Sequence, residues 1–131
     1  HEEAGLEVNE SLILAGDYSI ESGYECACQL LSASPAIDGI LCASDPMALG
    51  ALRALRERGL EPGVDIDFVA GDDFQSTRAI WPGLTSIRTP LYEQGYQAGA
   101  MIVDYILTGR EIPGKVLQGE LIVRRSVRSR K

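Results

Sequence analysis

Carboxylates follow two neighbouring apolar runs of the sequence, at the points where these runs end. Ser44-Asp45 comes directly after the run that ends at Ala43, and Asp72-Asp73 comes after Phe68-Val69-Ala70. If the two runs are parallel strands, the groups behind them emerge at the same edge of one sheet. Ligands of open α/β sheets bind at this carboxyl edge. Three carboxylates and one hydroxyl therefore predict a binding crevice for a small ligand.

The elements that would position these groups form a strand–helix–strand unit. Residues 37–43 read as a short buried strand, and residues 68–70 as the core of the second strand. Between them we expect a helix over residues 46–58, with Asp45 as N-cap, Pro46 at the first helical position and Gly59 as the left-handed stop. A crossover of this kind makes the two strands parallel.

The remaining elements fit the same α/β pattern. We expect strands at 12–14, 84–88 and 120–124, and helices at 20–32 and 73–80. Thr89-Pro90 repeats the pairing of a cap with a proline and opens a long helix that ends at Gly109. Gly95 and Gly99 within this helix predict a close backbone approach to another element.

Composition limits the classes of function. The 131 residues are 45% hydrophobic and 24% charged, which is typical of a soluble globular chain. The net charge of −7 argues against direct binding of a nucleic-acid backbone. We expect the basic cluster at the C-terminus, Arg124, Arg125, Arg128, Arg130 and Lys131, to be a solvated tail or a junction. No apolar run approaches the ~20 residues that span a bilayer, and no signal peptide opens the chain.

The cysteines and the histidine are poorly placed for a metal or a disulfide framework. Cys26, Cys28 and Cys42 are odd in number, and we expect free thiols in a reducing compartment. The only histidine is His1, so neither a metal site nor a bound cofactor is expected.

An enzymatic alternative would place Mg²⁺ among the three carboxylates for phosphoryl transfer. That chemistry needs a cation at the same edge, and the two lysines lie elsewhere, at Lys115 and Lys131. With a single terminal histidine no Ser-His-Asp constellation is available. We therefore expect no catalysis.

Four runs together resemble the effector-binding core of the lactose-repressor/galactose-repressor family of bacterial regulators. These runs are CASDPMALGALRALRERGL, DFVAGDDF, WPGLTSIRTPLYEQGYQAGAMIVDYILTG and ELIVRRS. The resemblance implies a periplasmic-binding-protein-like fold of type I, an α/β domain in which two lobes close on a small ligand and a parallel sheet is flanked by helices. On this basis 1–87 would be the C-terminal lobe of a partial effector-binding domain, 88–115 a crossover and helix of the N-terminal lobe, and 116–131 a return strand and tail.

The resemblance also assigns roles to single residues. Tyr18 matches an aromatic ligand contact, Ser44 stands where the family has an asparagine contact, and Asp72 matches the carboxylate that holds two effector hydroxyls. Thr89 matches a polar contact at the crossover, and Asp73 is expected to cap the following helix. Gly71 departs from the family pattern, which has an aromatic residue there, and this predicts either a wider floor of the pocket or a looser loop.

The implied function is a ligand-sensing and dimerisation domain of a cytoplasmic transcription regulator that acts as a homodimer. Its effector would be a carbohydrate or a nucleoside or purine, and DNA would be read by a headpiece outside this chain. The dimer contacts map onto the helix 46–58 and the segment 73–81, with Leu49, Leu52, Ile80 and Trp81 as candidates. The alternatives are a sensory domain of the same fold with another output, and a periplasmic sugar-binding protein of a transporter.

Overall fold

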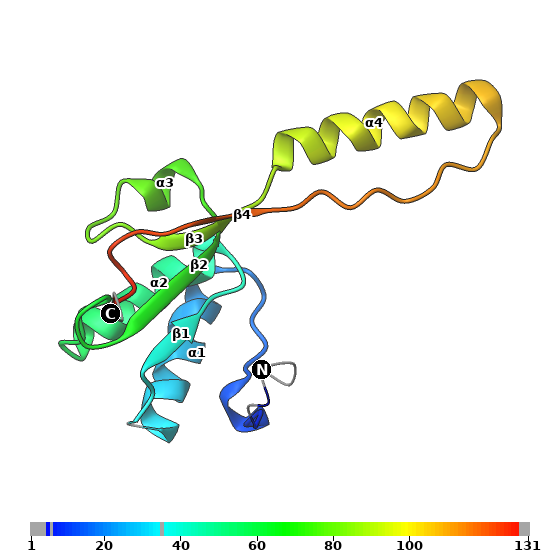
Figure 1. The fold of residues 1–131 in the computed structure, drawn as a ribbon. Coiled ribbons are helices and arrows are strands. Elements are labelled where there is room, and N and C mark those ends of the chain that lie inside the picture. Colours follow the sequence, from blue (N-terminus) through cyan, green and yellow to red (C-terminus); the bar gives the residue numbers. More distant parts are fainter. Residues whose placement is uncertain (1–4, 6, 35, 129–131) are drawn as a thin grey trace.

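The computed structural model describes residues 5, 7–34 and 36–128 of the chain. Its elements are, in chain order, η2 (Glu10–Leu12), α1 (Ile20–Ala33), β1 (Gly39–Leu41), α2 (Asp45–Glu57), β2 (Asp67–Asp72), α3 (Gln75–Arg78), β3 (Thr85–Arg88), α4 (Leu91–Thr108) and β4 (Glu120–Ile122). The four strands form one sheet in the order β1-β2-β3-β4. The first three strands are parallel and β4 is antiparallel to β3. The predicted α/β unit with a parallel sheet is confirmed for β1, β2 and β3, whereas the antiparallel direction of β4 was not predicted (Figure 1).

The core lies between the sheet and the two helices α1 and α2. Phe68 and Ala70 of β2 face Ala51 and Leu55 of α2, and all four are buried. The two helices approach closely because Gly23 and Gly50 carry no side chain. A Cβ atom on Gly23 would overlap the backbone of Met47, and one on Gly50 would overlap the carbonyl of Ile20. This packing fixes α2, and with it the loop that enters α2 from β1.

The C-terminal segment is built into the sheet. The Ser126 hydroxyl donates to the carbonyl of Phe68 at 2.5 Å and accepts from the backbone N–H of Thr85 at 2.8 Å. Arg128 contacts both oxygens of Asp67. Arg125 lies over the ring of Trp81 at 4.9 Å. The expectation of a solvated tail is therefore wrong for Arg124 and Arg128, which the fold holds by hydrogen bonds, whereas Arg125 is exposed. Arg130 and Lys131 lie outside the described residues.

Other local expectations are also corrected. Residues 12–14 form no strand, because within the described residues no neighbouring strand offers them backbone partners. Leu12 ends η2, which Asn9 caps, and residues 13 and 14 follow without regular structure. The strand expected at residues 37–43 is the shorter β1, and it is buried on one face only. Ile40 and Cys42 point into the core, but Leu41 is 70% exposed because no described helix covers its face.

Helix α4 leaves the sheet and projects away from it (Figure 1). None of its residues is buried, and Tyr92, Ile106 and Leu107 are strongly exposed. It ends at Gly109 in the left-handed conformation, as expected. The described residues make no close approach to Gly95 or Gly99, so that prediction is not met within this part of the chain. A long helix with an uncovered apolar side needs a partner that these residues do not supply.

Candidate ligand site at the carboxyl edge

Loops after parallel strands bring the predicted site residues to one edge of the sheet. Ser44 follows β1 and Asp72 ends β2, while Arg88 ends β3 and is the register partner of Asp72. The loop before α1 reaches the same edge, because Gly16 packs on the side chain of Met47 in the first turn of α2. Four chain segments therefore meet where open α/β sheets bind ligands.

Asp72 offers a carboxylate at this edge. Its backbone is left-handed, with φ 72°, and its side chain is partly exposed. One oxygen, Oδ2, accepts from the backbone N–H of Asp45 at a long 3.4 Å. A carboxylate has about four acceptor positions, so most of its hydrogen-bonding capacity remains for a ligand.

Tyr18 presents its ring from the neighbouring loop. The side chain is 68% exposed, and the backbone is again left-handed, with φ 66°. Asp17 next to it holds the turn through a hydrogen bond from the N–H of Ser19 at 2.9 Å. Hydrogen bonds from Ser19, and then from Ser22, lower the pKa of Asp17 to about 2. The loop is therefore ordered by its own side chains while the Tyr18 ring stays open.

Backbone strain coincides with this edge. Tyr18, Asp72 and Asp73 are the non-glycine residues with positive φ in the described chain, and all three lie in these loops. Such conformations cost about 1–3 kcal/mol each and persist where the surrounding structure imposes them, often at ligand sites. This observation supports a site at the edge independently of the residue types.

Ser44, and not Asp45 as predicted, is the N-cap of α2. The Ser44 hydroxyl accepts from the N–H of Met47 at 3.4 Å and caps α2, and Ser44 is only 4% exposed. Asp45 is the first residue of the helix, so its assignment as N-cap is wrong. Thr89 does not cap α4 either, since Pro90 occupies the cap position without a side-chain hydrogen bond. Thr89 is partly exposed beside β3.

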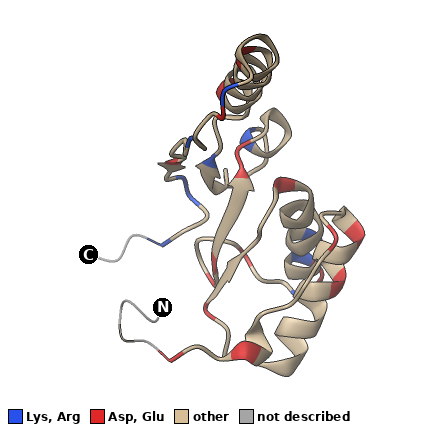
Figure 2. Cartoon of the chain, turned by 90° about the vertical axis from the view of Figure 1, so that its right-hand side faces the viewer, with Lys and Arg blue, Asp and Glu red and all other residues tan. Residues whose placement is uncertain are grey.

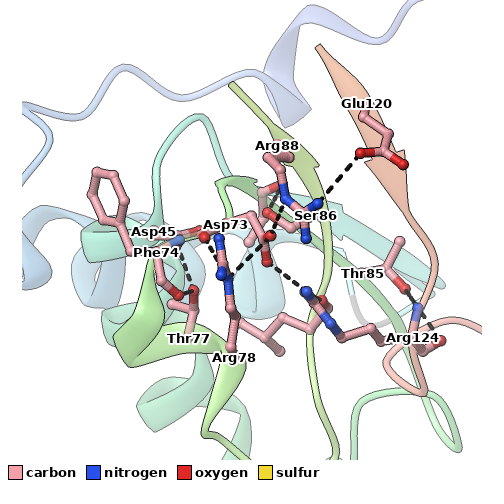
Figure 3. A network of polar contacts seen from close by, with 12 residues as sticks. Asp45, Asp73, Phe74, Thr77, Arg78, Thr85, Ser86, Arg88, Glu120 and Arg124 are labelled. Atoms are coloured by element: carbon pink, nitrogen blue, oxygen red, sulfur yellow. Dashed lines mark hydrogen bonds and ion pairs between the residues drawn. The ribbon is translucent and has the colours of Figure 1, made fainter. Parts of the chain in front are cut away.

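Asp73 lies in the interior, in contrast to its neighbour Asp72. Its side chain is fully buried and forms ion pairs with Arg124 at 2.6 Å, Arg88 at 2.8 Å and Arg78 at 3.2 Å (Figure 3). Burial raises the pKa of Asp73, but the hydrogen bonds and charges of the arginines outweigh burial and lower it overall. The expectation that Asp73 caps the next helix is wrong, because the three guanidinium groups hold its carboxylate.

Asp45 is a second buried carboxylate, and its contacts are different. It is 1% exposed, and its Oδ2 accepts from the N–H of Phe74 and from the hydroxyl of Thr77, both at 2.5 Å (Figure 3). Burial raises the pKa of Asp45, against the hydrogen bonds from Thr77 and Phe74, and the charges of Asp72 and Asp73 raise it further. These partners lie 29 and 32 residues away along the chain, and no local pattern around Asp45 predicts them.

Gly71 permits a close approach of β1 and β2 at the edge. A Cβ atom on Gly71 would lie 2.7 Å from the carbonyl oxygen of Ala43. The backbone of Ala43 thus leaves no room for a side chain at position 71. The wider floor or looser loop expected from this glycine stays a prediction.

A groove on the other side of α2 collects all four predicted interface residues. It has a volume of about 360 Å³ and is lined by Leu49, Leu52, Arg53, Arg56, Glu57, Ile80 and Trp81. Trp81 is 66% exposed, and its carbonyl accepts from Arg56 at 3.3 Å. Leu52 is 3% exposed, so it belongs mainly to the core.

Figure 2 marks the positions of the charged residues along the ribbon. Arginines occur in α2, at the ends of α3 and β3, and in the C-terminal segment. Among the residues that the structure describes, no three His, Cys, Asp or Glu side chains are grouped so that they could hold a metal ion. Within the same residues, no helix is long and apolar enough to cross a membrane.

A mainly parallel sheet with polar loops at its carboxyl edge defines an α/β domain. The family model of the periplasmic binding protein-like domain matches residues 1–127, and the chain belongs to this family.

Curated relatives indicate members of this family to which the chain is similar in sequence. The chain is 39% identical over 127 residues to the HTH-type transcriptional repressor PurR of Escherichia coli O1:K1 / APEC, which covers 96% of the chain and 37% of the repressor. For PurR of Yersinia pestis (strain Pestoides F) the identity is 37% over the same share. The chain thus spans little more than a third of these relatives.

Solved structures agree. The transcriptional regulator CelR in complex with cellobiose aligns with a TM-score of 0.88 and 32% identity over 95% of this chain and 38% of that one. The transcription regulator CcpA of Lactococcus lactis aligns with a TM-score of 0.85 and 29% identity, over 97% and 46%. The chain is homologous to the effector-domain region of LacI/GalR-family regulators, as the sequence motifs predicted.

Proposed function

We propose that this chain is the effector-sensing and dimer-forming part of a cytoplasmic transcription regulator, and that it has no catalytic activity. The observation that carries the proposal is the strained carboxyl edge, which combines the partly exposed Asp72 at the end of β2 with the exposed Tyr18 in the loop before α1. The regulators to which the chain is homologous support this choice over a transport protein.

The effector in this proposal is a carbohydrate or a nucleoside or purine. Asp72 accepts hydrogen bonds from two adjacent groups of the ligand, which are strong because the acceptor is charged. The ring of Tyr18 stacks on a flat or apolar face of the ligand. Thr89 adds a polar contact from the crossover, and Ser44 acts through the helix cap. Structures of related regulators contain cellobiose or ribose, which fits a polyol ligand.

Residues 88–115 belong to a second lobe in this proposal. Helix α4 has no buried residue and projects from the sheet. This is expected of a helix that packs against parts of the protein not included in this sequence. The effector binds between the lobes and favours one degree of closure, and the preferred closure alters DNA binding by a separate headpiece.

The dimer forms through the groove beside α2. Leu49, Ile80 and Trp81 supply apolar contact area, with Leu52 beneath them, and the charged side chains of Arg53, Arg56 and Glu57 surround it. An apolar centre with a charged rim is typical of protein interfaces.

A thermal-shift screen of the full-length protein tests the proposal. The ligands are monosaccharides, disaccharides, nucleosides and purines, and the variants are Asp72→Ala, Tyr18→Ala and Glu61→Ala. Glu61 is an exposed carboxylate in the turn before β2, at the opposite end of that strand, and serves as the matched control. We expect one ligand class to stabilise the wild type and Glu61→Ala, and neither of the other variants. A screen without any stabilising ligand would contradict the proposal.

A further inference from the structure

Asp45 connects the ligand edge to the groove by contacts at both ends of the residue. Its backbone N–H donates to Oδ2 of Asp72, the proposed ligand contact. Its carboxylate accepts from Phe74 and Thr77, which begin the segment that leads to the groove (Figure 3). One residue at the start of α2 therefore touches both the edge and this segment.

The segment 74–81 carries this connection to the groove. Thr77 is completely buried, and its carbonyl accepts from the N–H of Ile80 at 3.4 Å. Ile80 and Trp81 then line the groove opposite Leu49 of α2. The segment is thus held against α2 at two points, at Asp45 near the N-terminus of the helix and at Arg56 near its C-terminus.

Holding this segment through the buried Asp45 carboxylate lowers the stability of the fold. Its Oδ1 is buried and has no hydrogen-bond partner among the described residues. A buried polar group without a partner costs about 1–3 kcal/mol, and more when it is charged. Stability alone does not explain such a group, so its contacts to the two functional regions are the better explanation.

We propose that Asp45, together with Thr77, is a positioning pair that transmits the state of Asp72 to the interface residues Ile80 and Trp81. A ligand that takes the Asp72 carboxylate weakens its hydrogen bond from the N–H of Asp45. The start of α2 then shifts relative to the segment 74–81, and the groove changes shape. This inference rests on the proposed function for the roles of Asp72 and the groove.

The test needs no ligand, because a substitution that removes the Asp72 carboxylate imitates the loss of its hydrogen bond from the Asp45 N–H when a ligand binds. Fluorescence of Trp81, the only tryptophan of this chain, reports the groove; it is obtained as the difference between each full-length protein and its Trp81→Phe counterpart. Asp72→Ala removes the acceptor for the Asp45 N–H, whereas Asp72→Asn retains an acceptor oxygen. Thr77→Val removes the buried hydroxyl, Thr77→Ser retains it, and Ser76→Ala changes an exposed neighbour on α3 as control.

We expect Asp72→Ala to shift the Trp81 emission, and Asp72→Asn to leave it near that of the wild type. In the Thr77→Val background Asp72→Ala should produce no further shift, while the Thr77→Ser and Ser76→Ala backgrounds should respond like the wild type. Thr77→Val alone should also lower the affinity of the dimer, because Ile80 and Trp81 lose the contact that positions their segment, whereas Thr77→Ser should leave the affinity near that of the wild type.

An equal response of Trp81 to Asp72→Ala in the Thr77→Val and wild-type backgrounds would overturn the inference. If Thr77→Val does not fold, the comparison of Asp72→Ala with Asp72→Asn decides alone, and equal spectra for these two variants reject the connection. The emission cycle is measured without effector and also in a monomer. A failure of the effector screen or of dimerisation is therefore distinguishable from a failure of this cycle.

Discussion

Replacement of Asp73 by asparagine should destabilise the fold more than any surface substitution nearby. The Asp73 side chain is fully buried, and it is the common partner of Arg78, Arg88 and Arg124. Asparagine keeps the shape and removes the charge, so the change leaves three guanidinium groups around a neutral side chain.

The exposure of the three arginines determines how much free energy of unfolding Asp73→Asn should lose. Removing one partner of a buried ion pair costs about 3–5 kcal/mol, because the other charge stays uncompensated. Arg78 and Arg88 are 50% and 41% exposed and can turn toward water, whereas Arg124 is only 21% exposed. We therefore expect a loss near the lower end of the range, about 3 kcal/mol. For Arg78→Ala, the matched removal of a half-exposed partner, we expect about 1 kcal/mol or less.

Urea unfolding of the full-length protein, extrapolated linearly to water, measures both changes. The pKa of Asp73 is lowered in the folded state, so its stabilising effect is fully present above the unfolded value of 3.8 and is lost as the pH falls through the folded value. The difference between wild type and Asp73→Asn should accordingly shrink below about pH 4. A loss for Asp73→Asn no larger than that for Arg78→Ala would refute this reasoning.

Four further predictions concern the core, the interface and the second carboxylate. Asp45→Asn should not lower the free energy of unfolding at pH 7. Burial raises the pKa of Asp45, so the stability that this carboxyl group contributes is present below pH 3.8 and is lost as the pH rises through its folded pKa. Urea titrations at pH 4 and pH 7 check this. Gly50→Ala should cost about 1–3 kcal/mol by forcing α1 from α2, seen as a lower urea midpoint. Ser126→Ala should cost about 1–3 kcal/mol in the same assay, because the Phe68 carbonyl and the Thr85 N–H lose their hydrogen bonds to the Ser126 hydroxyl. Leu49→Arg should shift the dimer toward monomer in sedimentation equilibrium without a change in the urea midpoint of the subunit.

Local signals in the sequence were sufficient for much of the fold. The apolar run before Ser44, the proline at position 46 and the glycine at 59 place α2 within one residue of its observed bounds. The order strand, helix, strand then requires a parallel pair, which β1 and β2 form. These features are set by residues close together in the chain, so a pattern can predict them.

Contacts between distant residues could not be read in the same way. Nothing near Asp73 in the sequence indicates that Arg124 will reach it, and nothing near Asp45 points to Thr77. The adjacent carboxylates Asp72 and Asp73 look alike in the sequence, yet the backbone sends one to the open edge and the other into the interior. The expected strand at residues 12–14 failed for a related reason, because a strand depends on a neighbour that the local pattern does not reveal.

Hydrogen exchange of the full-length protein, with and without the stabilising ligand from the screen, tests the location of the site most directly. A ligand at the carboxyl edge should slow exchange of backbone amides in three segments, residues 16–19, 44–47 and 71–75. The turn around Glu61, at the other end of β2, should exchange as before. Slower exchange elsewhere, with these three segments unchanged, would contradict a site formed by Tyr18 and Asp72.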